Sequence, residues 1–248
     1  MTRLVPTEGG VIVAIDHPLY MWPVKGLEDR RALIEEVVAG GADGIIATYG
    51  TIRDHAGAFG GARKILKLDI KALSVGAYQE GDHAVCWSLE DAARIGADAV
   101  LSFVQVGCPD ELTAVTAAAR IAAECDRAGL PYLCEIMPIE SAGYPDPYAP
   151  EAIAACARVA AELGAHAVKT SIPSPAGAIA LAAACGLPVF LAGGDPQPTE
   201  AAFLEQVRAG IEGGASGVAV GRNVWGGADP GGTVARLCEI VHAATPVA

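Results

Sequence analysis

Short apolar runs recur along the chain, and most of them follow a glycine. Four follow a Gly-Ala pair and two follow Gly-Leu-Pro; the six glycines are Gly41, Gly96, Gly129, Gly164, Gly186 and Gly214. Glycine commonly ends a helix in the left-handed conformation, after which the chain can turn into a strand. Because a segment of helical composition precedes each glycine, the repeat predicts alternating helices and strands.

The pattern predicts eight strands, which are Val11–Asp16, Gly44–Thr48, Lys64–Asp69, Asp98–Phe103, Pro131–Met137, His166–Thr170, Val189–Ala192 and Val218–Gly221. Helices are expected between most of them, over Leu27–Ala39, Glu111–Arg127, Pro150–Leu163, Pro175–Ala184, Glu200–Glu212 and Thr233–Ala243. The segment around Asp54–Gly61 is the exception, because its glycines make it a poor helix.

Strands that alternate with helices in this way favour a closed (β/α)8 TIM barrel of the α/β class. The 248 residues suit one such domain, spanning positions 1–248. A doubly wound open sheet is the alternative. It would usually have fewer strands and a Gly-x-Gly-x-x-Gly turn after the first strand, which this chain lacks.

Composition narrows the choice of partners and compartment. Hydrophobic residues make up 52% of the chain and the formal net charge is −12, without a run of lysine or arginine, so no nucleic-acid or membrane partner is expected. The first residues lack the apolar segment of a signal peptide. The seven cysteines are scattered without a Cys-x-x-Cys pair, which favours reduced thiols in a cytoplasmic protein.

Polar side chains stand at the carboxyl ends of the expected strands, where the active sites of such barrels form. Lys169 ends the strand His166–Thr170, and burying a lysine is costly unless its charge is paired or neutralised. A lysine that is a free amine can attack a carbonyl carbon and form an imine. The alternative is a structural lysine paired with a carboxylate such as Asp16.

Two carboxylates and a second lysine end other strands. Asp16 can orient Lys169 or exchange protons with a substrate hydroxyl. Glu135, on the strand next to Lys169, can act as a general acid or base at the imine or form a buried ion pair. Lys67 shares a strand face with Asp69, so it is either a second cation that holds a substrate oxygen near Lys169 or one half of a Lys67–Asp69 pair.

Glycine-rich turns follow the last two strands, as Gly193-Gly194-Asp195 and Gly221-Arg222-Asn223. Loops at these two positions of a barrel frequently bind phosphate through backbone N–H groups, which glycine allows to approach the oxygens. Arg222 can add a charge-assisted contact, and its alternative is a salt bridge on the barrel rim. The two turns predict a phosphate site made by Gly193, Gly194, Gly221 and Arg222.

No metal or organic cofactor is expected. The five histidines form no His-x-His or His-x-x-x-His pair, and zinc sites usually show such spacing. Only His17 lies at an expected strand end, and a single histidine there is more often structural than catalytic.

The motifs together resemble a known family. Asp16-His17, Val168-Lys169-Thr170, Ala192-Gly193-Gly194 and Gly221-Arg222-Asn223-Val224-Trp225 are similar, in the same order, to motifs of the DhnA/DeoC-type class I aldolases. That family includes archaeal-type fructose-bisphosphate aldolases, tagatose-bisphosphate and sulfosugar-phosphate aldolases, and autoinducer-processing enzymes. The resemblance spans nearly the whole chain.

The resemblance implies a role for each of these residues. Lys169 would be the imine lysine, Asp16 a proton-handling carboxylate, and the two glycine turns with Arg222 the phosphate cradle. Leu133-Cys134-Glu135-Ile136 is similar to the segment of tagatose-bisphosphate and sulfosugar-phosphate aldolases in which a glutamate handles protons. Relatives commonly assemble, so a homo-oligomer is expected.

One stretch departs from the archaeal-type pattern. Those members carry a tyrosine near the end of strand five in a Tyr-Pro-Arg-Gly-like run, whereas this chain has Met137-Pro138-Ile139-Glu140. The nearest tyrosines are Tyr144 and Tyr148, and Tyr144 can substitute only if its loop folds inward. The proton donor is therefore left open among Glu135, Asp16 and Tyr144.

These features predict a lyase of carbohydrate metabolism, a metal-independent class I aldolase that breaks or forms a carbon–carbon bond in a phosphorylated ketose through Lys169. Two alternatives keep the fold. One is a coenzyme A-dependent, thiolase-like acyl transfer on a phosphorylated ketone. The other is a non-catalytic barrel that binds a sugar phosphate.

Overall fold

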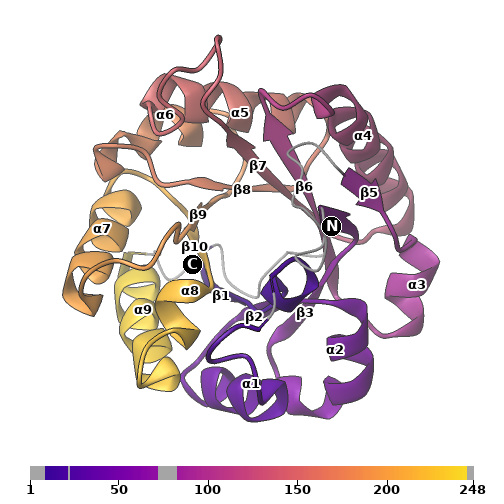
Figure 1. Ribbon diagram of the computed structural model, residues 1–248, viewed down its shortest axis with the longest axis vertical. Coiled ribbons are helices and arrows are strands. Elements are labelled where there is room, and N and C mark those ends of the chain that lie inside the picture. The colour runs from indigo at the N-terminus through magenta and orange to yellow at the C-terminus, as the bar shows by residue number, and fades with distance from the viewer. Residues whose placement is uncertain (1–8, 22, 72–82, 245–248) are drawn as a thin grey trace.

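A computed structural model of the chain describes residues 9–21, 23–71 and 83–244. Parallel strands close into a barrel in the order β1-β10-β9-β8-β7-β6-β3-β2, and helices form a ring around it (Figure 1). This arrangement confirms the predicted (β/α)8 barrel, and each expected strand is present. The barrel strands are β1 Gly10–Ala14, β2 Gly44–Ala47, β3 Arg63–Lys67, β6 Ala99–Val106, β7 Tyr132–Pro138, β8 Ala167–Ser171, β9 Val189–Ala192 and β10 Gly217–Val220.

The helices follow the expected segments closely. The α-helices are α1 Arg30–Ala39, α2 Tyr49–His55, α3 Leu89–Arg94, α4 Glu111–Ala128, α5 Pro150–Glu162, α6 Ala180–Ala183, α7 Glu200–Glu212, α8 Arg222–Trp225 and α9 Pro230–Ala244, and the 3-10 helices are η1 His17–Leu19, η2 Ala56–Phe59 and η3 Ala176–Ile179. Thr199 caps α7 by accepting a hydrogen bond from the Ala202 N–H, as its position before the helix indicates. The expected helix over Pro175–Ala184 is divided between η3 and α6.

The expectation that Asp54–Gly61 is not helical is wrong in part. Helix α2 continues to His55, and η2 follows it directly. The Thr48 side chain accepts a hydrogen bond from the Thr51 N–H and so caps α2. Ile52 and Phe59 are both fully buried, so tertiary packing outweighs the low helix propensity of the glycines.

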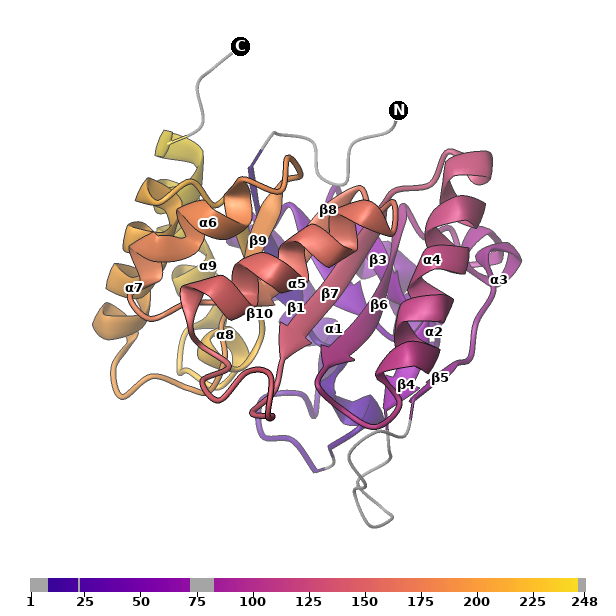
Figure 2. The same cartoon turned by 90° about the horizontal axis from the view of Figure 1, so that it is seen from above.

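A short antiparallel hairpin follows β3 and was not expected from the sequence. It consists of β4 Asp69–Lys71 and β5 His83–Val85, with Asp69 opposite Val85. The side view shows it beyond one end of the barrel (Figure 2). Strands of three residues are too short for their alternation to stand out, and the pairing joins residues far apart in sequence.

The strand side chains form two apolar layers. Alternate residues point into the barrel and form one cluster: Ile12, Ala14, Ile46, Ile65, Ala99, Leu101, Leu133, Ala167, Phe190 and Ala219. The residues between them pack outward against the helices. This alternation continues along each strand, so the next inward positions after Leu133 and Ala167 are those of Glu135 and Lys169.

Asp69 anchors the hairpin to the barrel through a fully buried network. Its carboxylate accepts hydrogen bonds from Lys67 Nζ at 2.7 Å and from the Phe103 N–H at 2.6 Å, and it lies 2.6 Å from His83 Nε2. Burial raises the pKa of Asp69, but the charge of Lys67 and the hydrogen bond with His83 outweigh it, so that pKa lies below its ordinary value. The network joins β3, β5 and β6 at one point.

None of the seven cysteines forms a disulfide bond, and most of them lie in or against the core. Burial raises the pKa of the Cys125, Cys134 and Cys156 thiols to about 12, which keeps them protonated and unreactive near neutral pH. In the described part of the chain, no helix is both long and apolar enough to cross a membrane. The first residues, interpreted above as lacking a signal peptide, lie outside the described residues.

Replacing Asp69 with asparagine is expected to destabilise the protein by about 3–5 kcal/mol, because Lys67 would be left as an unpaired buried charge. The free energy of unfolding, measured by urea denaturation at pH 7, tests this. The difference in free energy of unfolding between the two proteins should become smaller as the pH falls below about 4. A carboxylate whose pKa is lowered by folding stabilises the protein only at a pH at which it is ionised. Asp54→Asn, which removes an exposed pair with Arg53, is the control and should change little; an equal effect of the two changes would contradict the role of Asp69.

Candidate active site

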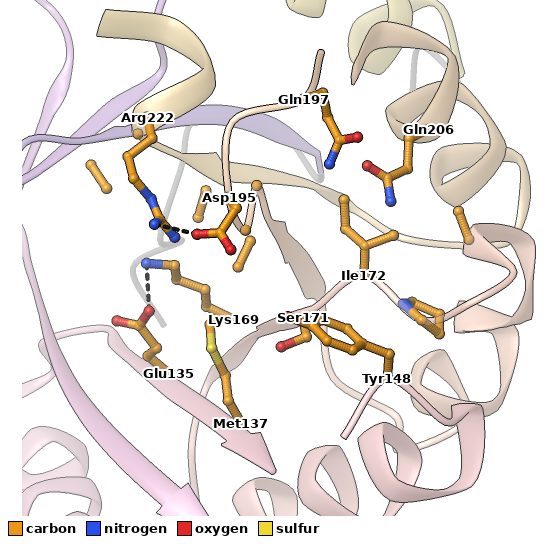
Figure 3. Close-up of a pocket in the computed structure, with 18 of the residues that line it drawn as sticks. Glu135, Met137, Tyr148, Lys169, Ser171, Ile172, Asp195, Gln197, Gln206 and Arg222 are labelled. Atoms are coloured by element: carbon orange, nitrogen blue, oxygen red, sulfur yellow. Dashed lines mark hydrogen bonds and ion pairs between the residues drawn. The ribbon is translucent and has the colours of Figure 1, made fainter. Parts of the chain in front are cut away.

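Lys169 and Glu135 form an ion pair inside the mouth of the barrel. They are partners in the register of β7 and β8, and Lys169 Nζ lies 2.7 Å from Glu135 Oε1 (Figure 3). Their side chains are only 8% and 13% exposed. The lysine is therefore paired as the sequence required, but its partner is Glu135 and not Asp16.

A cavity of about 570 Å³ opens above this pair. Its walls come from the carboxyl ends of the strands and the loops that follow them, which is where barrel active sites form. Lys169 and Glu135 both line it, and so do Gly193, Gly194, Gly221 and Arg222. Six of the eight residues expected to form the site thus meet in one cavity.

Asp16 lies behind the cavity wall and reaches it through neighbours. It is 1% exposed, and its Oδ2 accepts a hydrogen bond of 3.1 Å from the Tyr20 hydroxyl. Its Oδ1 has no hydrogen-bond partner among the described residues and lies 3.6 Å from His17 Nδ1. Tyr20 and His17 line the cavity, whereas Asp16 is not among the described residues that do.

Burial sets the protonation of these two neighbours of Asp16. It raises the pKa of Tyr20 well above its usual value, and the charge of Asp16 raises it further. Burial also lowers the pKa of His17. The positive charges of Lys169 and Arg222 lower that pKa further, whereas the negative charge of Asp16 raises it by less than burial lowers it. Tyr20 is consequently a neutral hydroxyl and His17 a neutral imidazole at pH 7. The sequence indicated a structural role for His17 and gave no reason to select Tyr20.

Lys67, like Asp16, is an expected site residue that does not line the cavity among the described residues. Its ammonium group is bonded to Asp69 and is only 4% exposed. Burial lowers the pKa of Lys67, but the carboxylates of Asp69, Glu135 and Asp16 outweigh it and hold that pKa above the ordinary value. The structural alternative, a Lys67–Asp69 pair, is what the chain forms.

The two glycine-rich turns face each other across one side of the cavity. Arg222 pairs with Asp195 at 2.5 Å, and the Asp195 side chain is 84% exposed (Figure 3). A Cβ on Gly221 would lie 2.7 Å from the Ala14 carbonyl oxygen, so only glycine fits there. The rim salt bridge considered for Arg222 is present, and its guanidinium also lines the cavity.

Asn223 fastens these two turns together. Its Nδ2 donates to the Gly193 carbonyl at 2.9 Å, and its Oδ1 accepts from the Gln197 N–H at 2.8 Å. Trp225 connects the segment after β10 to β1, because its indole N–H donates to the Ala14 carbonyl at 3.0 Å. Asn223 belonged to the motif read from the sequence, but its positioning role follows only from the fold.

The cavity is also lined by residues that sequence reasoning did not select. They are Ser171, Ile172, Gln197 and Gln206, together with Met137 and Tyr148 of the β7–α5 region. Tyr144 is not among the described residues that line the cavity, so its loop does not bring it to the site. Tyr148 does line the cavity, and it is 51% exposed.

The arrangement combines an amine, a carboxylate within hydrogen-bond distance of it, and a cavity lined by Arg222 and two glycine-rich turns. These are the parts that imine chemistry on a phosphorylated carbonyl compound needs. Within the described segments, no group of three or more histidine, cysteine, aspartate or glutamate residues is arranged to hold a metal ion.

Comparison with known proteins agrees with this chemistry. A model of the DeoC/LacD family of aldolases matches residues 10–227. The chain is 32% identical over 232 residues to 2-amino-4,5-dihydroxy-6-oxo-7-(phosphonooxy)heptanoate synthase of Streptomyces griseus, covering 93% of this chain and 84% of that enzyme. It is 32% identical over 244 residues to 2-amino-3,7-dideoxy-D-threo-hept-6-ulosonate synthase of Halobacterium salinarum, covering 98% of this chain and 90% of that enzyme.

The fold is also similar to that of a solved aldolase. An archaeal fructose-1,6-bisphosphate aldolase, with its catalytic lysine covalently bound to the carbinolamine intermediate of the substrate, superposes with a TM-score of 0.86. The two chains are 28% identical, and the match covers 95% of this chain and 94% of that one. The comparisons thus favour a Schiff-base aldolase over acyl transfer to coenzyme A or a non-catalytic barrel.

Asn223→Ala is expected to weaken the binding of inorganic phosphate roughly tenfold, because the two turns lose the side chain that holds them together. Isothermal titration calorimetry with phosphate measures this. Thr199→Ala is the control, since it removes the cap of α7 on the same loop without touching the link between the turns. If Asn223→Ala bound phosphate as tightly as the parent while Arg222→Ala bound it more weakly, the hydrogen bonds of Asn223 between the turns would not be needed for phosphate binding.

Proposed function

The chain belongs to the DeoC/LacD family of aldolases, and we propose that Lys169 is the residue that forms its Schiff base. The protein is a class I aldolase and hence a lyase. The observation that carries the proposal is the pairing of Lys169 Nζ with Glu135 Oε1 at 2.7 Å in the wall of the cavity. A lysine at this depth is useful for imine formation only if a neighbouring group can accept its proton.

Glu135 is that neighbour. In the first step Glu135 takes a proton from the Lys169 ammonium group, and the free amine attacks the carbonyl carbon of the substrate. The resulting carbinolamine loses its hydroxyl as water when Glu135 returns the proton. The product is a protonated imine, which remains beside the carboxylate that formed it.

Cleavage of the carbon–carbon bond follows from the positive charge of the imine. A carboxylate, Glu135 or Asp16, removes the proton of the hydroxyl two carbons from the imine carbon, and an aldehyde departs. The electrons of the broken bond move toward the imine nitrogen and form an enamine. Protonation of the enamine and hydrolysis of the imine then release the ketone and restore Lys169. We assign Asp16 its part through Tyr20, which donates a hydrogen bond to Asp16 and also lines the cavity.

The phosphate of the substrate is held by the turns after β9 and β10. Backbone N–H groups of Gly193, Gly194 and Gly221 can approach its oxygens, and Arg222 contributes a fixed positive charge. The Streptomyces griseus relative is named for a product with a phosphonooxy group, and the solved relative is named for a sugar bisphosphate. A phosphorylated ketose, or dihydroxyacetone phosphate in the direction of synthesis, is the proposed substrate.

We also propose a homo-oligomer located in the cytoplasm. The chain offers two exposed leucines that a partner could cover, Leu112 of α4 at 78% and Leu181 of α6 at 50%. The free cysteines support a reducing compartment. Light scattering of the purified protein tests the first of these two proposals.

Borohydride reduction in the presence of dihydroxyacetone phosphate should add the reduced ketone to Lys169 and to no other lysine. The adduct is located by mass spectrometry of the digested protein. Lys169→Met should abolish it. Lys64→Met is the matched control and should leave the adduct unchanged. Lys64 lies at the amino-terminal end of β3, where it pairs with Asp98. An adduct that persists in a folded Lys169→Met protein would refute the proposed role of Lys169.

Glu135→Gln should lower kcat by roughly 10²–10⁴-fold, the usual contribution of a general acid or base. The amide preserves the size of the side chain but can neither take nor return a proton. The lysine itself is retained, so slow borohydride trapping should still occur. Glu140→Gln changes an exposed glutamate shortly after the same strand and should leave kcat unaltered. Equal kcat values for Glu135→Gln and the parent would exclude Glu135 as the proton carrier.

A further inference from the structure

His17 lies between a buried carboxylate and the glycine-rich turn after β10. Its ring contacts Trp225 edge-on, with the two ring centroids 5.1 Å apart. A Cβ placed on Gly221 would meet His17 Cε1 at 2.7 Å, so the imidazole packs directly against the turn. Nδ1 of the same ring lies 3.6 Å from Asp16 Oδ1. The histidine therefore connects Asp16 to the turn that is proposed to hold the phosphate.

One edge of the His17 ring faces the active-site cavity. The residue lines the cavity, and its side chain is 13% exposed. Nδ1 is buried and Cε1 packs on Gly221, so the ring surface open to the cavity belongs to the edge that carries Nε2. Gly221 and Arg222 line the same cavity. An anion held by them would lie beside this edge.

Two buried polar atoms between His17 and Asp16 are left without partners. Neither Nδ1 of the ring nor Oδ1 of the carboxylate makes a hydrogen bond within the segments that the structure describes, and their separation of 3.6 Å is too long for one. Unpaired buried polar atoms are unfavourable. A neutral imidazole has a single N–H, whereas the protonated ring has two. After a small shift of the ring, protonated His17 could donate to Asp16 and into the cavity at once.

The charges that face His17 decide whether it is protonated. They belong to Asp16, Glu135, Lys169 and Arg222. Burial and the two cations lower the pKa of His17 against the opposing effect of the two carboxylates, and the neighbouring Tyr20 ring is an uncharged phenol. A bound anion would offset the charge of Arg222 and attract the imidazolium directly. We expect the pKa of His17 to rise when an anion binds.

We propose that His17 is a phosphate-binding residue, which takes up a proton from solution as the phosphate binds and holds a phosphate oxygen through Nε2–H while Nδ1–H pairs with Asp16. The inference rests on the proposed function, because it concerns the phosphate site at the turns after β9 and β10. His17 adds to Arg222 a second cation that forms together with the complex. Asp16 is a positioning residue in this contact, since its Oδ1 orients the ring while its Oδ2 stays with Tyr20.

Proton and anion should strengthen each other's binding, because coupling between two ligands is reciprocal. The affinity for a dianion should therefore rise as the pH falls through the range in which histidine gains its proton. Sulfate is the probe, since it has the shape and charge of a phosphate dianion but gains no proton itself near neutral pH. Any proton taken up with sulfate consequently comes to the protein.

Isothermal titration calorimetry with sulfate measures both quantities at constant ionic strength. Titrations at pH 7 in two buffers with different heats of ionisation give the number of protons taken up, and we expect roughly half a proton. The affinity should be roughly tenfold higher at pH 6 than at pH 8.5, because a charge-assisted hydrogen bond is gained.

His17→Gln keeps a hydrogen-bond donor but cannot be protonated. It should abolish the proton uptake and flatten the dependence of sulfate affinity on pH, with the larger loss of affinity at low pH. His242→Gln is the matched control, because His242 pairs with Asp43 just before β2, at the opposite end of the barrel from the cavity. The control should retain both the uptake and the pH dependence.

A measurement on the unmodified protein covers the case in which His17→Gln does not fold. NMR follows the Cε1–H signal of His17 from pH 5 to pH 9 with and without sulfate. The midpoint of its titration should lie at higher pH when sulfate is present.

Borohydride trapping with dihydroxyacetone phosphate on the same preparations keeps this inference apart from the aldolase mechanism. An adduct on Lys169, together with sulfate binding that takes up no proton or leaves the His17 titration unmoved, would overturn the inference alone. Equal proton uptake in His17→Gln would assign the proton to another group and overturn it as well. Failure of sulfate to bind would refute the phosphate site and the role of His17 with it. Proton uptake by His17 without an adduct on Lys169 would support His17 and refute the imine role of Lys169.

Discussion

Both lysines that are buried in the described part of this barrel are paired with a carboxylate, and that constraint organises the rest of the site. The inward-facing positions below the mouth are apolar, so a single charged side chain above them would have no compensating group. Lys169 is accordingly matched by Glu135 on the neighbouring strand, and Lys67 by Asp69 on its own chain segment. The two pairs differ in access. The first opens onto the cavity, while the second is sealed beneath the β4–β5 hairpin and serves the fold.

This difference explains how two lysines with similar sequence settings acquire different roles. Lys67 donates to a carboxylate that is also held by His83 and by the Phe103 N–H, so both oxygens of Asp69 are engaged. Lys169 has a single carboxylate partner that itself faces the cavity. A lysine that must release its proton, bind a carbon atom and be restored during each cycle needs the second kind of environment.

The alternation of apolar residues in the strands and the glycines at the helix ends were enough to predict the barrel. They also led to six expected site residues that line one cavity. The strand parity that puts Leu133 and Ala167 inside the barrel also puts Glu135 and Lys169 there. The sequence was insufficient where contacts depend on loop geometry. The Tyr20–Asp16 hydrogen bond, the position of Tyr148 rather than Tyr144 at the cavity and the tie made by Asn223 join segments whose spacing carries no signal. The hairpin was missed because strands of three residues lack a readable period.

The position of the phosphate site relative to Lys169 connects the electrostatics to the chemistry. In the proposed mechanism, Arg222 and the turns after β9 and β10, which line the cavity, hold the substrate phosphate on one side of the amine, and this fixes the carbonyl carbon of the attached ketone over Nζ. When the imine forms, its positive charge takes the place of the ammonium group beside Glu135, so the pairing is preserved while a covalent bond replaces a proton. The covalent step thus leaves the net charge of the Lys169–Glu135 pair unchanged.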